Sequence, residues 1–212
     1  MLKFGKAFVA GLLLLAVIPQ VSATKIAPMN LVDLVERSAR IFEGRVTAIN
    51  HTTVKSSDGK WDYPVVNYTF EVLDDLRGIG SKTVILSQMG HFQDGRRTRF
   101  DPDQIGIPRY ELGKQYVLFM GRNGRTGLCS PIGFHLGMFD VLAGKAFHRV
   151  DNRFVMNGMG PALKGTSHER LTKPVVLKNG QADGMDVTGL KALIRDLITG
   201  SVKAPKWEEI KK

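Results

Sequence analysis

The alternation of apolar and polar positions predicts a chain built mainly from β-strands. A first strand is expected over 40–49, where alternate positions are apolar or small: Phe42, Gly44, Val46 and Ala48. Gly44 inside this strand indicates a bend or bulge. The same two-residue period predicts strands over 65–73 and 82–88. The continuous apolar run 115–120 predicts a strand that is buried on both faces.

Two segments instead repeat their apolar positions every three to four residues, as amphipathic helices do. The first covers 30–38, where Asn30 is a suitable N-cap. The second covers 186–200, with Asp186 as N-cap and Gly200 at its end. The apolar stripe of this second helix must pack on the rest of the fold and consists of Leu190, Leu193, Ile194, Leu197 and Ile198.

The intervening segments are expected to be connections and further short strands. Residues 51–64 form a polar connection, and further strands over 137–142, 146–150 and 153–156 extend the sheet as a meander. Residues 90–109 form a long polar loop. Because long loops in compact domains are often functional, this loop is the first place to look for a binding surface.

The first 23 residues predict a cleavable secretory signal peptide. Lys3 and Lys6 precede the apolar run 7–18, whose ~12 residues fall short of the ~20 that a membrane-spanning helix needs. Small residues over 21–23 suit signal peptidase. An uncleaved anchor is the alternative. We therefore expect an exported protein, periplasmic or extracellular, that begins at Thr24 and has no transmembrane segment after cleavage.

Three fragments resemble a known fold family. They are IFEGRV (41–46), YTFEVLDDLRG (68–78) and YELGKQYVLF (110–119). Their order is similar to that of the netrin/TIMP-like version of the OB barrel. It is closer still to a group of exported bacterial proteins, in which F-x-G-x-V precedes G-x-P-x-Y-x-x-G-x-x-Y-V-L-F, here 106–119. The resemblance covers 31–142 and concerns fold more than function.

The resemblance and the patterns together imply a mainly β fold. We expect an OB-like β-barrel with an extra β-meander, a short N-terminal helix and a C-terminal amphipathic helix. The expected division is a signal peptide (1–23), the barrel domain (24–157), an arm or linker (158–185), the C-terminal helix (186–200) and a basic tail (201–212).

Cysteine usage departs from the family pattern. Netrin-like domains and the related protease inhibitors carry disulfides, and the inhibitors ligate a protease metal through an N-terminal cysteine. Here the expected N-terminal residue is Thr24, and Cys129 is the single cysteine. Cys129 is expected to be buried; the alternative is an exposed thiol that pairs between chains.

No motif predicts catalysis. The five histidines, His51, His91, His135, His148 and His168, form no H-E-x-x-H or H-x-H pattern. Ser130 has no nucleophile-elbow sequence around it, and the acids of Asp74-Asp75 and Asp101/Asp103 are expected to serve turns. We therefore expect no catalytic residue, no metal site and no cofactor.

The charge of the chain suggests its partners. Without Lys3 and Lys6 the formal net charge falls from +10 to +8, and no basic stripe indicates nucleic acid. The expected function is a non-enzymatic binding module of the cell envelope, with an anionic polymer or an acidic protein as partner. The alternatives are an envelope enzyme or protease inhibitor, and a structural subunit of an envelope assembly. The candidate binding residues are His91, Arg96, Arg97, Arg99, Arg122 and Arg125.

Overall fold

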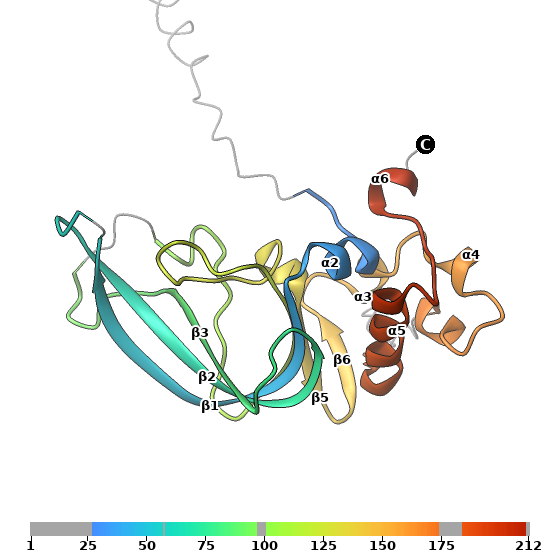
Figure 1. Cartoon of the computed structure of the whole chain (residues 1–212), viewed down its shortest axis with the longest axis horizontal. Coiled ribbons are helices and arrows are strands. Elements are labelled where there is room, and N and C mark those ends of the chain that lie inside the picture. The colour runs from blue at the N-terminus through green and yellow to red at the C-terminus, as the bar shows by residue number, and fades with distance from the viewer. Residues whose placement is uncertain (1–26, 57, 97–100, 174–183, 211–212) are drawn as a thin grey trace, which may run out of the picture.

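A computed structural model of the chain describes residues 27–56, 58–96, 101–173 and 184–210 (Figure 1). The described part of the chain is dominated by a seven-stranded antiparallel sheet in the order β3-β2-β1-β4-β5-β6-β7, so the expectation of a mainly β fold is confirmed. The sheet is not closed, and β3 and β7 are its outer strands. The strands are β1 (Arg40–Lys55), β2 (Asp62–Arg77), β3 (Thr83–Met89), β4 (Gln115–Met120), β5 (Met138–Leu142), β6 (Lys145–His148) and β7 (Met185–Asp186).

The β1–β2 hairpin is the longest pairing and is strongly curved (Figure 1). It pairs from Ile41 opposite Arg77 to Lys55 opposite Asp62, with a register shift between Glu43 and Gly44. That shift confirms the bulge expected at the glycine. The expectation that 51–64 is a polar connection was wrong for most of its length. Both strands continue there as a two-stranded ribbon. Its β1 side is exposed throughout, and only Pro64 is buried on its β2 side, so no alternating apolar pattern marks it.

The two expected helices are confirmed. Helix α2 (Leu31–Arg37) begins at Asn30, whose side chain accepts a hydrogen bond from the Asp33 backbone N–H, while the Asp33 carboxylate accepts one from the Asn30 N–H. Helix α5 (Val187–Thr199) is capped by Asp186 and ends at Gly200 in the left-handed region. The remaining helical turns are η2 (Phe134–Gly137), α3 (Asn152–Val155), α4 (Gly160–Leu163), η3 (Glu169–Thr172) and α6 (Trp207–Ile210).

Two expectations for the C-terminal half differ from the structure. The strand expected over 153–156 was wrong, because Asp151 caps a helical turn there by accepting from the Arg153 N–H. Part of the segment expected as an arm, 158–173, holds α4 and η3, and it buries Met159 and Leu163 completely. Residues 174–183 of that segment lie outside the described residues, as does the expected signal peptide.

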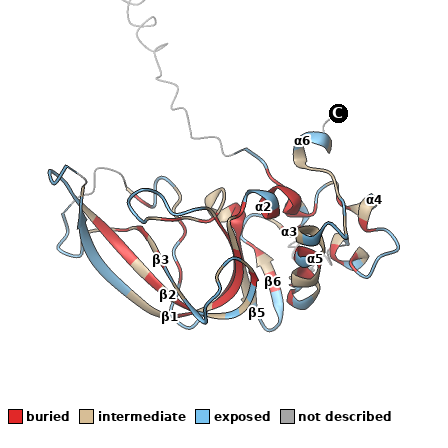
Figure 2. Ribbon diagram, in the orientation of Figure 1, coloured by how far each residue is buried: buried red, intermediate tan, exposed pale blue. Residues whose placement is uncertain are grey.

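The two faces of the sheet carry separate cores. Figure 2 shows the buried residues along the strands and the exposed outer end of β1. On the helix-covered face, apolar side chains of β1, β4 and β5 pack with α2 and α5. On the loop-covered face, an aromatic cluster is joined by residues of two loops, Tyr110 and Cys129. The burial expected for Cys129 is confirmed. Within the described residues, no helix combines the length and apolar character that crossing a membrane requires.

Candidate functional site

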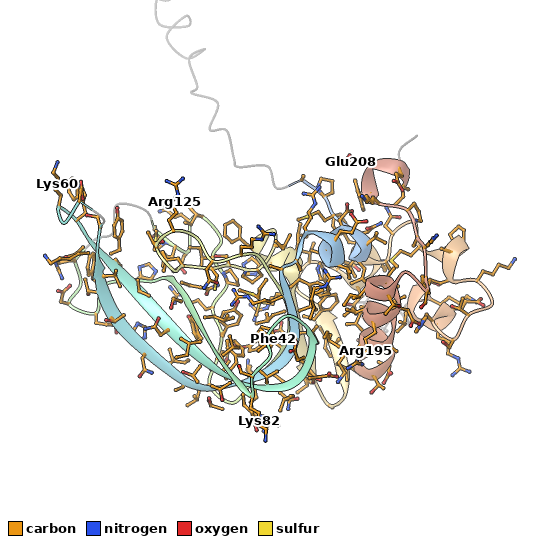
Figure 3. All side chains as sticks on the ribbon, viewed as in Figure 1. Phe42, Lys60, Lys82, Arg125, Arg195 and Glu208 are labelled. Carbon is orange, nitrogen blue, oxygen red and sulfur yellow. The ribbon has the colours of Figure 1, made fainter. Side chains whose placement is uncertain are left out.

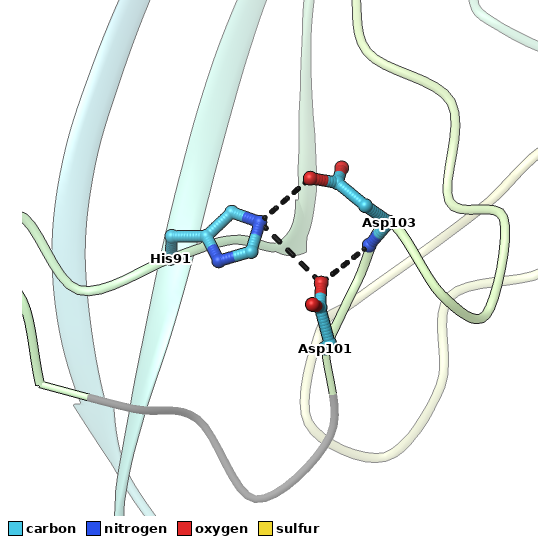
Figure 4. Close-up of side chains that lie close together, drawn as sticks. All are labelled: His91, Asp101 and Asp103. Atoms are coloured by element: carbon cyan, nitrogen blue, oxygen red, sulfur yellow. Dashed lines mark hydrogen bonds and ion pairs between the residues drawn. The ribbon is translucent and has the colours of Figure 1, made fainter.

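The site begins where β3 ends and the long loop starts. The backbone N–H of Gly90 donates to the carbonyl of Pro64, which holds this point against β2. A Cβ at Gly90 would overlap the side chain of Val66, so the close approach requires glycine. The next residue, His91, places its Nε2 atom 3.2 Å from Oδ2 of Asp103 and 3.8 Å from Oδ1 of Asp101 (Figure 4).

The two carboxylates are held by a tight turn and by an arginine. The Asp101 side chain accepts a hydrogen bond from the backbone N–H of Asp103 at 2.9 Å. The Asp103 carboxylate in turn accepts from Nη2 of Arg109 at 2.5 Å. Ligand atoms of His91, Asp101 and Asp103 therefore all lie within 4.8 Å of one another.

Next to this cluster is a pocket of about 200 Å³ on the loop-covered face. Its wall combines strand residues with residues of the long loop, so the loop closes over the end of the sheet. The polar and aromatic groups that line it are His51, Tyr68, Gln88, His91, Gln93 and Arg109. Burial raises the pKa of Tyr68, so its phenol is neutral at physiological pH.

Gln88 is the one buried polar side chain of this pocket that is not fully satisfied among the described residues. Its side chain on β3 is 1% exposed, and its Nε2 donates a long hydrogen bond of 3.4 Å to the Tyr110 hydroxyl. Its Oε1 has no hydrogen-bond partner there. Exchanging the amide oxygen and nitrogen would leave the nitrogen without a partner instead. Because burying such a group costs about 1–3 kcal/mol, the amide favours a ligand or water in the pocket.

The arginines expected from the sequence lie in different surroundings. Arg96 is exposed, with Nε 2.8 Å from the Asp94 carboxylate and its guanidinium 4.3 Å from the ring centre of Phe92. Arg122 and Arg125 are exposed in the loop that follows β4. Figure 3 shows Arg125 projecting outward from the fold. The other two candidates, Arg97 and Arg99, lie outside the described residues.

The loop that carries Arg122 and Arg125 adjoins the same end of β3 as His91. The backbone N–H of Cys129 donates to the Ser87 carbonyl at 2.9 Å. Thr126 and Leu128 line a second pocket, of about 340 Å³, together with Met89. Because Met89 also lines the first pocket, both loops lie against the C-terminal end of β3.

Sequence reasoning missed Gln88, Asp101, Asp103 and Arg109 as members of the site. The two aspartates were expected to serve turns, and Asp101 does so here by accepting from a backbone N–H. The D-x-D spacing within a histidine-bearing polar loop is the signal that would have found them. Gln88 gives no signal of its own, because glutamine is common at exposed strand positions.

The described residues contain no arrangement typical of nucleophilic catalysis. Cys129 is buried, and no serine, threonine or cysteine side chain in the described part of the chain hydrogen-bonds to a histidine ring. The convergent groups of the site are therefore suited to binding: amides, imidazoles, carboxylates and a guanidinium.

Comparison of the chain with models of known protein families and with curated proteins gave no match.

Proposed function

We propose that this chain is an exported, non-enzymatic binding module of the cell envelope, and that it binds an anionic envelope polymer at the C-terminal end of β3. One observation carries the proposal. The two loops that bear its basic residues adjoin the same strand end, through the Cys129 to Ser87 hydrogen bond and the shared contact with Met89. Two separate loops can therefore contact one extended ligand.

The charge of this surface supports the choice of an anionic ligand. Arg122 and Arg125 have no acidic partner among the described residues, so their charges are available to a ligand. Arg96 is already paired with Asp94 and is expected to contribute less. Exposed charges of this kind bind weakly one at a time, and an extended polymer gains from contacting several together.

The architecture we propose for the module is the OB-like barrel of netrin/TIMP-like type. Two features support it: the long, bulged and curved β1–β2 hairpin, and the loop residues that fill its inner face. OB folds are partly open barrels, and they bind extended polymers across one face and the loops at its rim. The loop-covered face with its rim loops is the corresponding surface here.

Charge reversal at matched positions tests the proposal. The variants Arg122→Glu and Arg125→Glu are compared with Lys82→Glu, which makes the same charge change at the opposite side of the molecule (Figure 3). On an alginate-coupled column, we expect both arginine variants to elute at lower salt than wild-type protein and than Lys82→Glu. The difference should shrink above about 0.15 M salt, where the screening length is about 8 Å. Elution of all three variants at the same salt concentration would refute the binding surface.

Recovery from envelope extract separates the remaining possibilities. An acidic protein captured by wild-type protein but lost from Arg125→Glu would replace the polymer as partner. Self-association of the chain would favour a structural subunit. Export itself is tested by N-terminal sequencing of the protein recovered from cells, which should begin at Thr24.

A further inference from the structure

We infer that His91, Asp101 and Asp103 form a binding site for a divalent transition-metal cation at the edge of the pocket beside β3. The inference does not rest on the proposed polymer binding, and it concerns a ligand that the sequence spacing did not predict. His91 lies at the start of the long loop and the two aspartates lie in its second half, and the fold brings the three side chains together (Figure 4).

The geometry suits a small cation. With metal–ligand bonds of about 2.0–2.1 Å, two ligand atoms around a tetrahedral ion lie about 3.3 Å apart. The His91 Nε2 and Asp103 Oδ2 atoms are 3.2 Å apart, and Asp101 Oδ1 is 3.8 Å from the imidazole nitrogen. All three ligand atoms lie within 4.8 Å of one another, and the side chains are 40–52% exposed, so they have room to close around an ion.

The donor set selects the class of ion. One imidazole nitrogen and two carboxylate oxygens suit Zn²⁺ and Mn²⁺, whereas Ca²⁺ and Mg²⁺ prefer oxygen ligands alone. Three protein ligands leave at least one position open to water. The Asp103 carboxylate also accepts from Arg109, a contact of the kind that orients metal-binding carboxylates.

The second observation is the unsatisfied amide of Gln88. This side chain is 1% exposed, lines the same pocket as His91, and has an Oε1 atom with no donor in the described part of the chain. Water bound to a cation is a strong hydrogen-bond donor. Gln88 and His91 line the same pocket, so water bound to an ion on His91 is a candidate donor for this amide oxygen; ion pairing between His91 and the two aspartates alone provides none.

The test is a titration of the purified, tag-free chain after chelator treatment, with Zn²⁺, Mn²⁺ and Ca²⁺ added separately in a calorimeter. We expect one Zn²⁺ or Mn²⁺ ion per chain and weaker binding of Ca²⁺. His91→Ala and Asp101→Asn should each weaken Zn²⁺ binding by at least the ~10–100-fold that loss of an outer-shell partner costs. Asp94→Asn removes a carboxylate from the same loop but outside the cluster, and it should leave the affinity unchanged.

Two further measurements support the titration: electron paramagnetic resonance detects binding without relying on heats, and circular dichroism checks that the variants fold. The electron paramagnetic resonance signal of free hydrated Mn²⁺ should fall on addition of wild-type protein and not on addition of His91→Ala. Circular dichroism should show both variants folded, because the substituted side chains are 40% exposed and belong to neither apolar core. Absence of binding, or an equal affinity in wild type, His91→Ala and Asp101→Asn, would overturn the site. Because these titrations contain no polymer, a negative result would overturn the metal site and leave the proposed polymer binding untouched.

Discussion

The ammonium group of Lys191 in α5 lies 2.6 Å from the carboxylate of Glu43 in β1, and the two side chains are only 16% and 9% exposed. The same ammonium lies 2.9 Å from Asp74 in β2. Burial lowers the pKa of Lys191, but its hydrogen bonds to Glu43 and Asp74 outweigh that effect and hold the pKa above its usual value. The helix is thus joined to β1 and β2 by charge as well as by apolar packing.

We predict that Lys191→Met destabilises the fold by about 3 kcal/mol, the lower end of the cost of breaking a buried pair. The loss arises because the Glu43 carboxyl group is left in a buried place without its ammonium partner. Chemical denaturation measures it. The double variant Lys191→Met/Glu43→Leu should recover much of the loss, since replacing both partners with apolar groups removes the unpaired charge. Equal stability of the single and double variants would contradict this account.

Local signals sufficed for the elements that were predicted correctly. The run 115–120 became β4 at the expected bounds because every position but the first is buried. Helices α2 and α5 could be predicted from their caps, Asn30 and Asp186, because a cap and an apolar stripe lie within a few residues of each other. Gly44 could be placed at a bulge because glycine inside a strand has few other uses.

Elements that depend on distant partners were not predictable in this way. At the outer end of the β1–β2 hairpin every residue of β1 over 50–55 is exposed, so this part of the strand carries no apolar pattern in the sequence. Helix α3 forms because Asp151 caps it and because Val155 is fully buried. In the sequence alone, these two residue types do not distinguish a helical turn from the end of a strand. Whether the sheet closes into a barrel is likewise set by long-range pairing.

The candidate site shows the same contrast between local sequence signals and contacts with distant residues. His91 was identified because it lies in a long polar loop. Its carboxylate neighbours are 10 and 12 residues away, and only the folding of the loop brings them to within ion-pair distance. Gln88 became important only because the loop covers it and leaves its Oε1 without a partner.

Gly137 lies where another backbone passes too closely for a side chain. A Cβ there would come within 2.6 Å of the Ile132 carbonyl oxygen and 2.9 Å of the Phe119 carbonyl oxygen. We predict that Gly137→Ala costs about 2–3 kcal/mol, because two backbone segments must move apart. Gly160→Ala is the control, since nothing lies within 4 Å of its Cβ position; it should change stability by less than about 0.5 kcal/mol. Similar urea midpoints for the two variants would contradict the prediction.

Cys129 is 6% exposed and packs in the loop-covered core, so its thiol is expected to act as a small apolar group. We predict that Cys129→Ser remains folded and loses about 1 kcal/mol of stability. On gels run without reductant, wild-type protein should migrate as a monomer, as the variant does. A covalent dimer that disappears in the variant would show that the thiol reaches the surface.

His148 provides a test of stability against pH. Its Nε2–H donates to the Leu136 carbonyl at 2.7 Å, and its Nδ1 accepts from the backbone N–H of Asp151 at 3.2 Å. Both ring nitrogens are therefore satisfied in the neutral form. Burial lowers the pKa of His148 below its usual value of 6.5 and outweighs the hydrogen bond to Leu136, which acts in the opposite direction.

Because the folded pKa lies below the unfolded one, the unfolded chain binds more protons once the pH falls below about 6.5. The contribution of His148 to stability is thus fully present above pH 6.5 and is lost as the pH falls toward the folded pKa. The slope is at most about 1.4 kcal/mol per pH unit for one proton. We predict that His148→Gln is less stable than wild type at pH 8 and loses less stability between pH 7 and 5. Urea unfolding at several pH values measures this, and parallel pH profiles for the two proteins would exclude His148 as the titrating group.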